Sequence, residues 1–269
     1  SDQDSFMARS AILHVMVQAA LKAGKSLSRD FGEVQNLQVS LKGPGDYVSQ
    51  ADRKAEEIVK AELMRARPDY GFLGEEGGAT EGADGQHRWI VDPLDGTTNF
   101  LHGIPMFAIS IALERQGQIV AGVIYNPALD ELYTAEKGGG TFLNDRRLRV
   151  AARTKLTDAV VGTGVPHLGR GHHGNYLVQL RNVMGEVAGV RRLGAAALDL
   201  AYVAAGRFDG FWEEGLGAWD VAAGILMIRE AGGFVSDISG GQKMLDSGSI
   251  VAGNELIHKA LLKTLAKPA

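Results

Sequence analysis

The chain has 269 residues, of which 45% are hydrophobic, and its formal net charge is −4. This composition excludes a disordered chain and fits one large domain, residues 1–269, built of two interlocked lobes, while the negative charge provides no general field that would attract nucleic acid or an anionic membrane. The absence of cysteine excludes disulfides, thiolate metal sites and a cysteine nucleophile.

The first third of the chain is expected to be largely helical. Residues 1–6 precede Met7 and are expected to be either a cloning remnant or an exposed, disordered native start. From Met7 to about Phe31, apolar residues recur at helical spacing and predict an amphipathic helix. Gly43-Pro44-Gly45 predicts a turn, and residues 50–67 predict a second helix, which Pro68 ends.

Beyond residue 70 the pattern becomes strand-like. Short β-prone runs are separated by Gly, Pro and Asn, which predicts strands joined by turns. The stretch from Phe107 to Phe142 is typical of an antiparallel meander, with turn signals at Gly138-Gly139-Gly140 and Asn144-Asp145. The predicted strands are Tyr70–Leu73, Arg88–Val91, Phe107–Glu114, Ile119–Tyr125 and Glu131–Glu136.

The second half alternates strands and helices. We expect two lobes, about 7–150 and about 151–269, made of helices and sheets in layers. Gly206 is expected to cap a strong helix, and Gly232-Gly233 to end another. The predicted strands are Ala159–Gly162, Phe208–Glu213, Phe234–Ser236 and Ser249–Ala252, and the predicted helices are His173–Ala188, Ala195–Ala205, Trp219–Ala231 and Glu255–Leu265.

No apolar run reaches the roughly 20 residues that a membrane helix needs. The longest runs, such as Ala11 to Val17, fall far short of it, and no basic segment precedes a signal-like core. We therefore expect no contact with a membrane and a cytoplasmic location.

The segment Trp89-Ile-Val-Asp-Pro-Leu-Asp-Gly-Thr-Thr-Asn-Phe100 joins an apolar strand to two aspartates three residues apart. The proline between the aspartates fixes φ, so a turn can aim both carboxylates and the Leu94 carbonyl at one point. Oxygen ligands of this kind suit Mg²⁺ rather than Zn²⁺. Gly96 lets the backbone approach a ligand closely, and Thr97 and Thr98 can cap a short helix whose free N–H groups suit an anion. Alone, however, the segment is more typical of an Asp-rich turn.

Two further acidic clusters change that balance. Gly74-Glu75-Glu76-Gly77-Gly78 follows a short β-prone run, and Asp220 opens a helix whose interior is Ala-Ala-Gly. Each of them alone is more typical of a solvated turn or an ordinary helix cap. Three acidic clusters, each at the mouth of a strand or helix, favour a shared metal site.

In these three segments, and in their order and spacing, the chain resembles the inositol monophosphatase family, and within it the bacterial SuhB-type enzymes. Gly194–Gly206 and Phe208–Glu213 resemble the family too, and the likeness runs from about Met7 to the end. The resemblance implies a layered αβαβα sandwich of the α+β class, a homodimer, Mg²⁺-dependent hydrolysis of a phosphate monoester and inhibition by Li⁺.

The resemblance also implies the metal ligands. Glu75, Asp92 and the Leu94 carbonyl would hold a first Mg²⁺. Asp92, Asp95 and Asp220 would hold a second, with Asp92 bridging the two. A third, weaker ion would lie near Glu75, so that two to three Mg²⁺ ions are expected.

Catalytic roles are implied for Thr97, Asp52 and Glu75. Thr97, paired with Asp52, would help to activate the attacking water. Asp52 ends the segment Asp46-Tyr-Val-Ser-Gln-Ala-Asp52, where the family often has Thr in place of Ser49, and Ser keeps the hydroxyl. Lys42 would lie near the site on a loop. The implied substrate-binding residues are Asp95, Gly96 and Thr97 around the phosphate, and Gly194, Ala196 and Glu213 facing the polyol.

The chemistry of the reaction agrees with these roles independently. A phosphate monoester dianion repels nucleophiles, and metal ions neutralise its charge, lower the pKa of a bound water and stabilise the leaving oxygen. Such a site needs clustered carboxylates and no covalent nucleophile. We therefore expect direct attack by metal-activated water.

Several functions stay open. The first is hydrolysis of myo-inositol 1-phosphate. Relatives with the same metal motifs cleave histidinol phosphate, fructose 1,6-bisphosphate or 3′-phosphoadenosine nucleotides, and Glu213 accepts hydrogen bonds from polyol hydroxyls but also suits an amine. A function of another class is a SuhB-like role as a partner of the transcription machinery through RNA polymerase, without direct contact to nucleic acid.

Two cationic features are interpreted as structural. His167, His172 and His173 lie in a Gly-rich stretch with no acidic partner nearby in the sequence, which favours a solvated loop. Arg191-Arg192 is assigned to the dimer interface that the resemblance implies.

Overall fold

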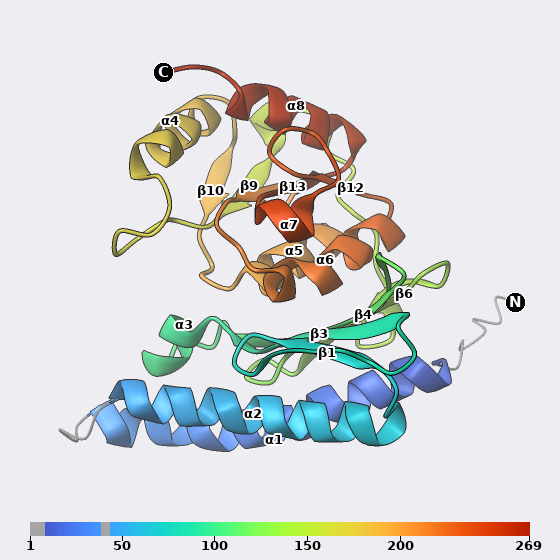
Figure 1. The fold of residues 1–269 in the computed structure, drawn as a ribbon. Coiled ribbons are helices and arrows are strands. Elements are labelled where there is room, and N and C mark those ends of the chain that lie inside the picture. Colours follow the sequence, from blue (N-terminus) through green and yellow to red (C-terminus); the bar gives the residue numbers. More distant parts are fainter. Residues whose placement is uncertain (1–8, 39–43) are drawn as a thin grey trace, which may run out of the picture.

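The computed structural model describes residues 9–38 and 44–269 of the chain. In this part of the protein, five layers lie on one another: two helices, a sheet, two helices, a second sheet and two helices (Figure 1). Three hydrophobic clusters fill the spaces between the layers. The expected αβαβα sandwich is confirmed.

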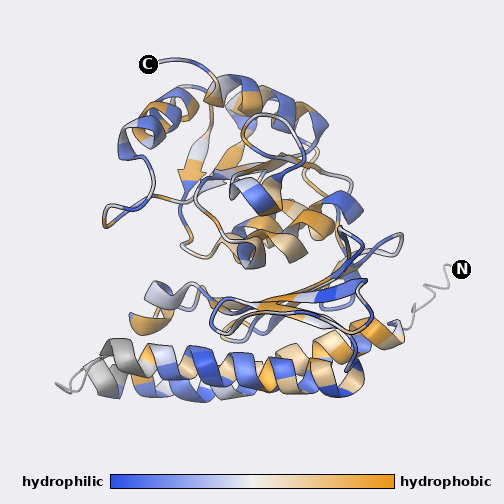
Figure 2. Cartoon of the chain, in the orientation of Figure 1, coloured by the Kyte–Doolittle hydropathy of each residue, from blue (hydrophilic) through white to orange (hydrophobic). Residues whose placement is uncertain are grey.

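The first layer consists of α1 (Ala11–Gln38) and α2 (Pro44–Ala66). Their buried apolar residues pack against the first sheet. Figure 2 shows that both helices combine hydrophobic and hydrophilic residues, as expected of helices with one buried face. The prediction of a turn at Gly43-Pro44-Gly45 was wrong for Pro44 and Gly45, which are the first residues of α2. Gly43 lies outside the described residues. Proline fits this position because the first helical N–H needs no partner inside the helix. Lys42 lies outside the described residues.

The first sheet has eight strands in the order β2-β1-β3-β4-β5-β6-β7-β8. All neighbours are antiparallel except β1 and β3, which are parallel. The predicted meander from Phe107 to Phe142 is confirmed as β4 to β7. The strands are β1 (Gly71–Gly74), β2 (Gly78–Thr80), β3 (His87–Asp95), β4 (Ala108–Arg115), β5 (Gln118–Asn126), β6 (Glu131–Glu136), β7 (Gly140–Leu143) and β8 (Arg146–Arg147).

The middle layer consists of α5 (Ala196–Ala204) and α6 (Ala218–Glu230). Both helices are buried on most sides because they lie between the two sheets, and Figure 2 shows their mostly hydrophobic residues. Small residues let them approach each other closely. A Cβ atom added to Gly224 on α6 would lie 2.5 Å from the side chain of Leu200 on α5.

The second sheet has five strands in the order β10-β9-β11-β13-β12, and α4 (His173–Met184) and α8 (Glu255–Leu265) cover its outer face. The predicted helix at His173–Ala188 is therefore shorter, and an edge strand that the sequence did not reveal follows it. Among the described residues, no helix combines the length and apolar character needed to cross a bilayer. The strands are β9 (Val160–Thr163), β10 (Gly189–Arg191), β11 (Gly210–Glu213), β12 (Phe234–Ser236) and β13 (Ile250–Gly253), and the short helices are α3 (Thr97–Leu101), η1 (Leu156–Asp158) and α7 (Met244–Ser247).

Candidate active site

An irregularity in β3 brings the two aspartates of the Trp89–Phe100 segment to one face of the sheet. Asp92 pairs with Ser110 of β4, whereas Asp95 pairs with Ala108, so β3 carries one residue more than β4 between these positions. In a regular strand, residues three apart point to opposite faces, and one extra residue returns them to the same face. The bulge therefore turns a D-x-x-D spacing into a pair of neighbouring carboxylates.

Two remote segments add carboxylates to this pair. Asp220 comes from the first turn of α6, and its carboxylate oxygens lie within 4.8 Å of those of Asp92 and Asp95. Glu75 follows β1, and because β1 runs parallel to β3 it arrives at the same end of the sheet. The Glu75 amide donates to the Val91 carbonyl at 3.3 Å.

Asp92 is the centre of this cluster. Its carboxyl group shares hydrogen bonds with the carboxyl groups of both Glu75 and Asp220. Asp92 is buried, Asp95 and Asp220 are half-buried, and Glu75 is the most exposed. Removal from water, followed by the neighbouring negative charges, raises the pKa of Asp92 and of Asp95 well above the ordinary value for aspartate.

The cluster fits a divalent cation. Two carboxyl groups share a hydrogen bond only when one of them carries a proton, and a cation between them takes the place of that proton. Every side-chain donor in the cluster is an oxygen, which suits a hard cation such as Mg²⁺ and is a poor set for zinc. Burial, joined at Glu75, Asp92 and Asp95 by repulsion from neighbouring acids, raises the pKa of the carboxyl groups in this cluster.

Backbone hydrogen bonds hold the carboxylates in place. The Leu94 amide donates to Asp92 Oδ1 at 3.1 Å, the Ala197 amide at the start of α5 donates to Asp95 Oδ2 at 2.7 Å, and the Gly217 amide donates to Asp220 Oδ2 at 2.8 Å. The side chains therefore need little reorganisation when a cation binds.

Gly96 shapes the loop that follows Asp95. Its φ of 89° lies in the left-handed region, and a Cβ atom there would lie 2.8 Å from the Met106 carbonyl oxygen. The close approach places Thr97 as the first residue of α3. Asn99 then fixes α3, because its amide donates to the Met106 carbonyl at 2.7 Å and to the Leu193 carbonyl at 2.8 Å.

A cleft of about 260 Å³ opens above the carboxylates. Glu213 lies in it at the end of β11, and burial, followed by repulsion from Asp220, raises the pKa of Glu213 to about 7, although Arg192 opposes the shift. All the predicted phosphate- and polyol-facing residues line this one cleft: Asp95, Gly96, Thr97, Gly194, Ala196 and Glu213.

Asp52 lies on α2 beside the acidic cluster. Burial, then repulsion from Glu76, Glu75 and Glu56, raises its pKa to about 8. Among the described residues, no group forms a hydrogen bond with its Oδ1. Helix α2 packs against α3, the helix that begins at Thr97. The pairing of Asp52 with Thr97 stays a prediction.

Comparison with known proteins identifies the family of the chain. The sequence pattern of the inositol monophosphatase family matches residues 8–268. The chain belongs to the inositol monophosphatase family. As a member of this family it is a phosphatase, and the resemblance seen in its motifs is confirmed.

Several known proteins are similar to this inositol monophosphatase family member in sequence or in structure. An inositol-1-monophosphatase of Mesorhizobium japonicum is 80% identical over 262 residues, covering 97% of this chain and 98% of the relative. A protein named Nus factor SuhB, from Pseudomonas aeruginosa, is 46% identical and covers 94% of this chain and 95% of its own length. The crystal structure of extragenic suppressor protein suhB from Bartonella henselae has a TM-score of 0.90 at 67% identity, covering 97% of this chain and 100% of that one.

The structure also reveals cleft residues that sequence reasoning missed in this family member. Arg192, interpreted above as an interface residue, lines the cleft. Its positive charge opposes the burial that raises the pKa of Glu213 and of Asp199. Asp199 is buried inside α5, and its Oδ1 has no partner among the described residues. A single acid in the apolar run Ala195–Ala205 was the signal that could have identified it.

The histidine-rich loop divides into two parts. His167 lies exposed on a loop, as predicted, and it also lines the cleft together with Arg170. His172 instead caps α4, since its Nδ1 accepts a hydrogen bond from the Asn175 amide at 3.0 Å. The cleft therefore has an acidic floor and a basic outer rim.

Proposed function

We propose that this phosphatase hydrolyses myo-inositol 1-phosphate to inositol and phosphate with Mg²⁺ as its cofactor. The observation that carries the proposal is the gathering of Glu75, Asp92, Asp95 and Asp220 in one acidic cluster, of which Asp95 and Asp220 line a cleft together with Glu213. The name of the Mesorhizobium relative supports the choice of substrate.

Two to three Mg²⁺ ions are proposed in this cluster. Glu75, Asp92 and the Leu94 carbonyl would hold one, Asp92, Asp95 and Asp220 a second, and the surroundings of Glu75 a third. The central place of Asp92, which shares hydrogen bonds with Glu75 and Asp220, supports its role as the bridging ligand. When bound, the ions neutralise the phosphate and lower the pKa of water.

The side chains around the cations bind and orient the reactants. The N–H groups of Gly96 and Thr97 would hold the phosphate oxygens. The Thr97 hydroxyl and the Asp52 carboxylate would orient the attacking water and accept its proton. The Glu213 carboxylate would accept hydrogen bonds from polyol hydroxyls, with Gly194 and Ala196 leaving room for the ring.

A panel of phosphate monoesters assayed with Mg²⁺ tests the substrate. We expect the highest kcat/KM for inositol 1-phosphate. We also expect Li⁺ at millimolar order to inhibit this hydrolysis. A higher kcat/KM for histidinol phosphate, fructose 1,6-bisphosphate or a 3′-phosphoadenosine nucleotide would reassign the substrate. In water enriched in ¹⁸O, the label is expected in the phosphate, and label in the inositol would contradict direct attack by water.

The remaining expectations are part of the proposal. We propose a cytoplasmic homodimer whose chains each contain two lobes, about 7–150 and about 151–269. Sedimentation equilibrium tests the dimer, because the mass of a single chain is 28.6 kDa.

A second candidate function is association with RNA polymerase. The relatives named Nus factor SuhB, 46% identical in Pseudomonas aeruginosa and 42% in Escherichia coli, favour it. A pull-down with RNA polymerase, comparing the wild type with Asp95→Asn, separates the two activities. We expect both proteins to retain the polymerase and only the wild type to retain phosphatase activity. Full turnover by Asp95→Asn would contradict the site assignment.

A further inference from the structure

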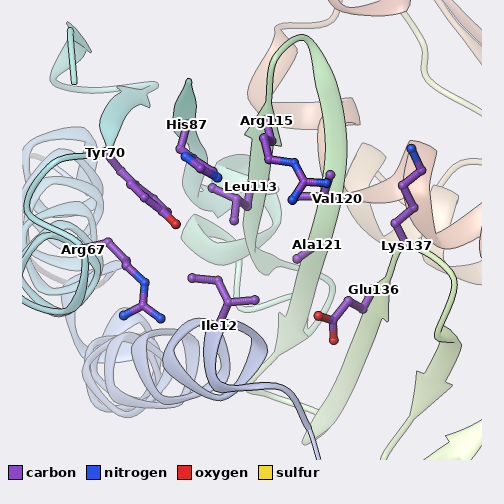
Figure 3. Close-up of a pocket in the computed structure, with 10 residues that line it drawn as sticks. All are labelled: Ile12, Arg67, Tyr70, His87, Leu113, Arg115, Val120, Ala121, Glu136 and Lys137. Carbon is purple, nitrogen blue, oxygen red and sulfur yellow. The ribbon is translucent and has the colours of Figure 1, made fainter. Parts of the chain in front are cut away.

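A second cavity, of about 310 Å³, lies at the opposite end of the first sheet (Figure 3). It forms where the helix layer stops before the sheet does, between the first turn of α1 and the end of α2. His87 opens β3 at this cavity, whereas Asp92 and Asp95 lie near the other end of the same strand. Five residues of extended strand span about 17 Å, so the cavity is separate from the acidic cluster.

The cavity has an apolar floor. Leu113 of β4 and Ala121 of β5 are direct neighbours across the two strands, and both face the helix layer. Ile12 of α1 covers them from the other side. Leu113 and Ala121 are almost completely buried, so the half-buried Ile12 and Val120 provide the apolar surface that a ligand can contact.

An aromatic wall closes one side. The rings of Tyr70 and His87 stack at 4.2 Å with planes only 6° apart, and Asp84 holds the Nδ1 of His87 at 2.6 Å. Trp89 packs behind Tyr70, with ring centroids 5.6 Å apart. Figure 3 shows the hydroxyl end of Tyr70 turned toward the cavity. The wall is held by neighbours on two sides, so it is formed before any ligand arrives.

Cations predominate around this apolar centre. Arg67, Arg115 and Lys137 line the cavity, opposed by the single carboxylate of Glu136, although the whole chain is negatively charged. Within the part of the chain that the structure describes, the Arg67 side chain donates only to the neighbouring Ala66 carbonyl, at 2.8 Å. The guanidinium of Arg115 has no hydrogen-bond or ion-pair partner within residues 9–38 and 44–269, and Figure 3 shows it turned inward.

Lys137 differs from the two arginines. Its Nζ donates to Gln118 Oε1 at 2.5 Å, and in Figure 3 it points away from the cavity centre. The anion-binding capacity therefore rests on Arg67 and Arg115. A guanidinium presents paired N–H donors that match a phosphate, phosphonate or carboxylate group.

We propose that this cavity, lined by Arg67, Arg115 and the Tyr70–His87 stack, is a second binding site for a small organic anion. The ligand carries a phosphate or carboxylate group, which Arg115 binds and Arg67 attracts from another side of the cavity, and an apolar ring or chain that contacts Ile12 and Val120. The cavity volume lies at the small end of the range for ligand pockets, which fits a single-ring compound.

Calorimetric titration with phenylphosphonate tests the site. Its P–C bond is not a substrate for a phosphate monoester hydrolase. The protein is first freed of divalent cations, and the chelator is then removed by dialysis because EDTA is itself an organic anion that would compete for the cavity. The carboxylates of the active-site cleft are then uncompensated and repel the probe. We expect the wild type to bind, the double variant Arg67→Gln/Arg115→Gln to bind at least tenfold more weakly, and Glu136→Gln to bind about threefold more tightly because a repelling charge is removed.

Matched controls separate the cavity from general effects. Arg29→Gln is exposed on α1, about 25 Å farther along the helix than Ile12, and should bind as the wild type does. Asp95→Asn should also bind normally, so failure of the proposed phosphatase site leaves this result unchanged.

Three outcomes would overturn the proposal: no binding to the wild type, unchanged binding to the double variant, or equal affinity for inorganic phosphate and phenylphosphonate. The last would show that the apolar floor takes no part. Far-UV circular dichroism establishes that each variant is folded, and the gain expected for Glu136→Gln does not depend on a loss of structure.

Discussion

At the scale of single residues, Asp92 lies in surroundings that strongly disfavour its charged form. It is almost completely buried, and it shares hydrogen bonds with two other acids, so removal from water and repulsion act on it together. Such an arrangement lowers the stability of the fold when the cluster is ionised and contains no cation. The same arrangement makes the free energy of cation binding large.

Asp92→Asn is therefore expected to have opposite effects on activity and on stability. Asparagine keeps the size of the side chain and removes a buried charge, so the metal-free variant should melt at a higher temperature than the metal-free wild type. Its Mg²⁺-dependent turnover should fall by at least about a hundredfold, as befits loss of a bridging ligand. Melting curves in EDTA and in Mg²⁺, together with kcat, measure both effects.

The neighbouring Glu76→Gln supplies the control for Asp92→Asn. Glu76 is exposed and is not a proposed ligand. Its substitution should change turnover by less than about threefold. A similar loss in both variants would mean that general negative charge, and not the bridging position, matters.

At the scale of elements, the close packing of α5 against α6 depends on the absence of a side chain at Gly224. The approach of α6 to α5 at Gly224 leaves no room for a methyl group, whereas an added Cβ atom at Gly32 on the outer face of α1 would meet nothing within 4 Å. The two helical glycines thus differ in their surroundings and not in their local conformation.

Gly224→Ala should destabilise the protein by roughly 1–2 kcal/mol, because overpacking against Leu200 outweighs the gain in helix propensity. Gly32→Ala should instead stabilise it by roughly 0.5–1 kcal/mol, because only the propensity changes. Urea denaturation of the two variants and the wild type measures both. Destabilisation by Gly32→Ala as large as that by Gly224→Ala would contradict the packing argument.

Elements with strong local patterns were predictable from the sequence. The helix at Ala195–Ala205 and the meander from Phe107 to Phe142 have spacings that specify them without reference to the rest of the chain. Strands of two or three residues, such as β8 and β10, are too short to carry a pattern. They exist because a longer neighbour offers free hydrogen-bonding groups.

The acidic residues of the candidate site could be recognised from the sequence, but their geometry could not. The residues of the Asp92–Thr97 segment identified the chemistry, and the resemblance supplied Glu213 and Gly194. The bulge in β3 depends on the register with β4, which the sequence of β3 alone does not contain. The place of Arg192 beside the cleft was not predicted for the same reason, since only the folded chain brings its loop there.

At the scale of the whole molecule, the acidic cluster governs how stability depends on pH. The folded state holds the pKa of Asp52 at about 8 and that of Glu213 at about 7, against 3.8 and 4.5 for the free groups. Between about pH 4 and pH 8 the folded protein therefore binds more protons than the unfolded chain, so stability falls as the pH rises. The lowered pKa of His258 acts in the opposite direction, but it is one group against several.

The metal-free protein should consequently melt at a higher temperature at pH 5 than at pH 8. Mg²⁺ should restore stability mainly at pH 8, because at pH 5 it must compete with the bound protons. Differential scanning calorimetry in EDTA and in Mg²⁺ at both values measures the four transitions. An equal increase in melting temperature with Mg²⁺ at pH 5 and at pH 8 would contradict a cluster that exchanges protons for cations.

The hydrogen bond from the Ala197 amide to Asp95 places two selective pressures on one position. Folding alone requires only an acceptor oxygen at the start of α5, and asparagine supplies one as well as aspartate does. A divalent cation requires the negative charge in addition. Relatives that abandoned hydrolysis but kept the architecture would be free to carry asparagine at the position of Asp95, whereas alanine would leave α5 without its acceptor. The aspartate at this position therefore agrees with the proposed cation site, which the fold alone does not require.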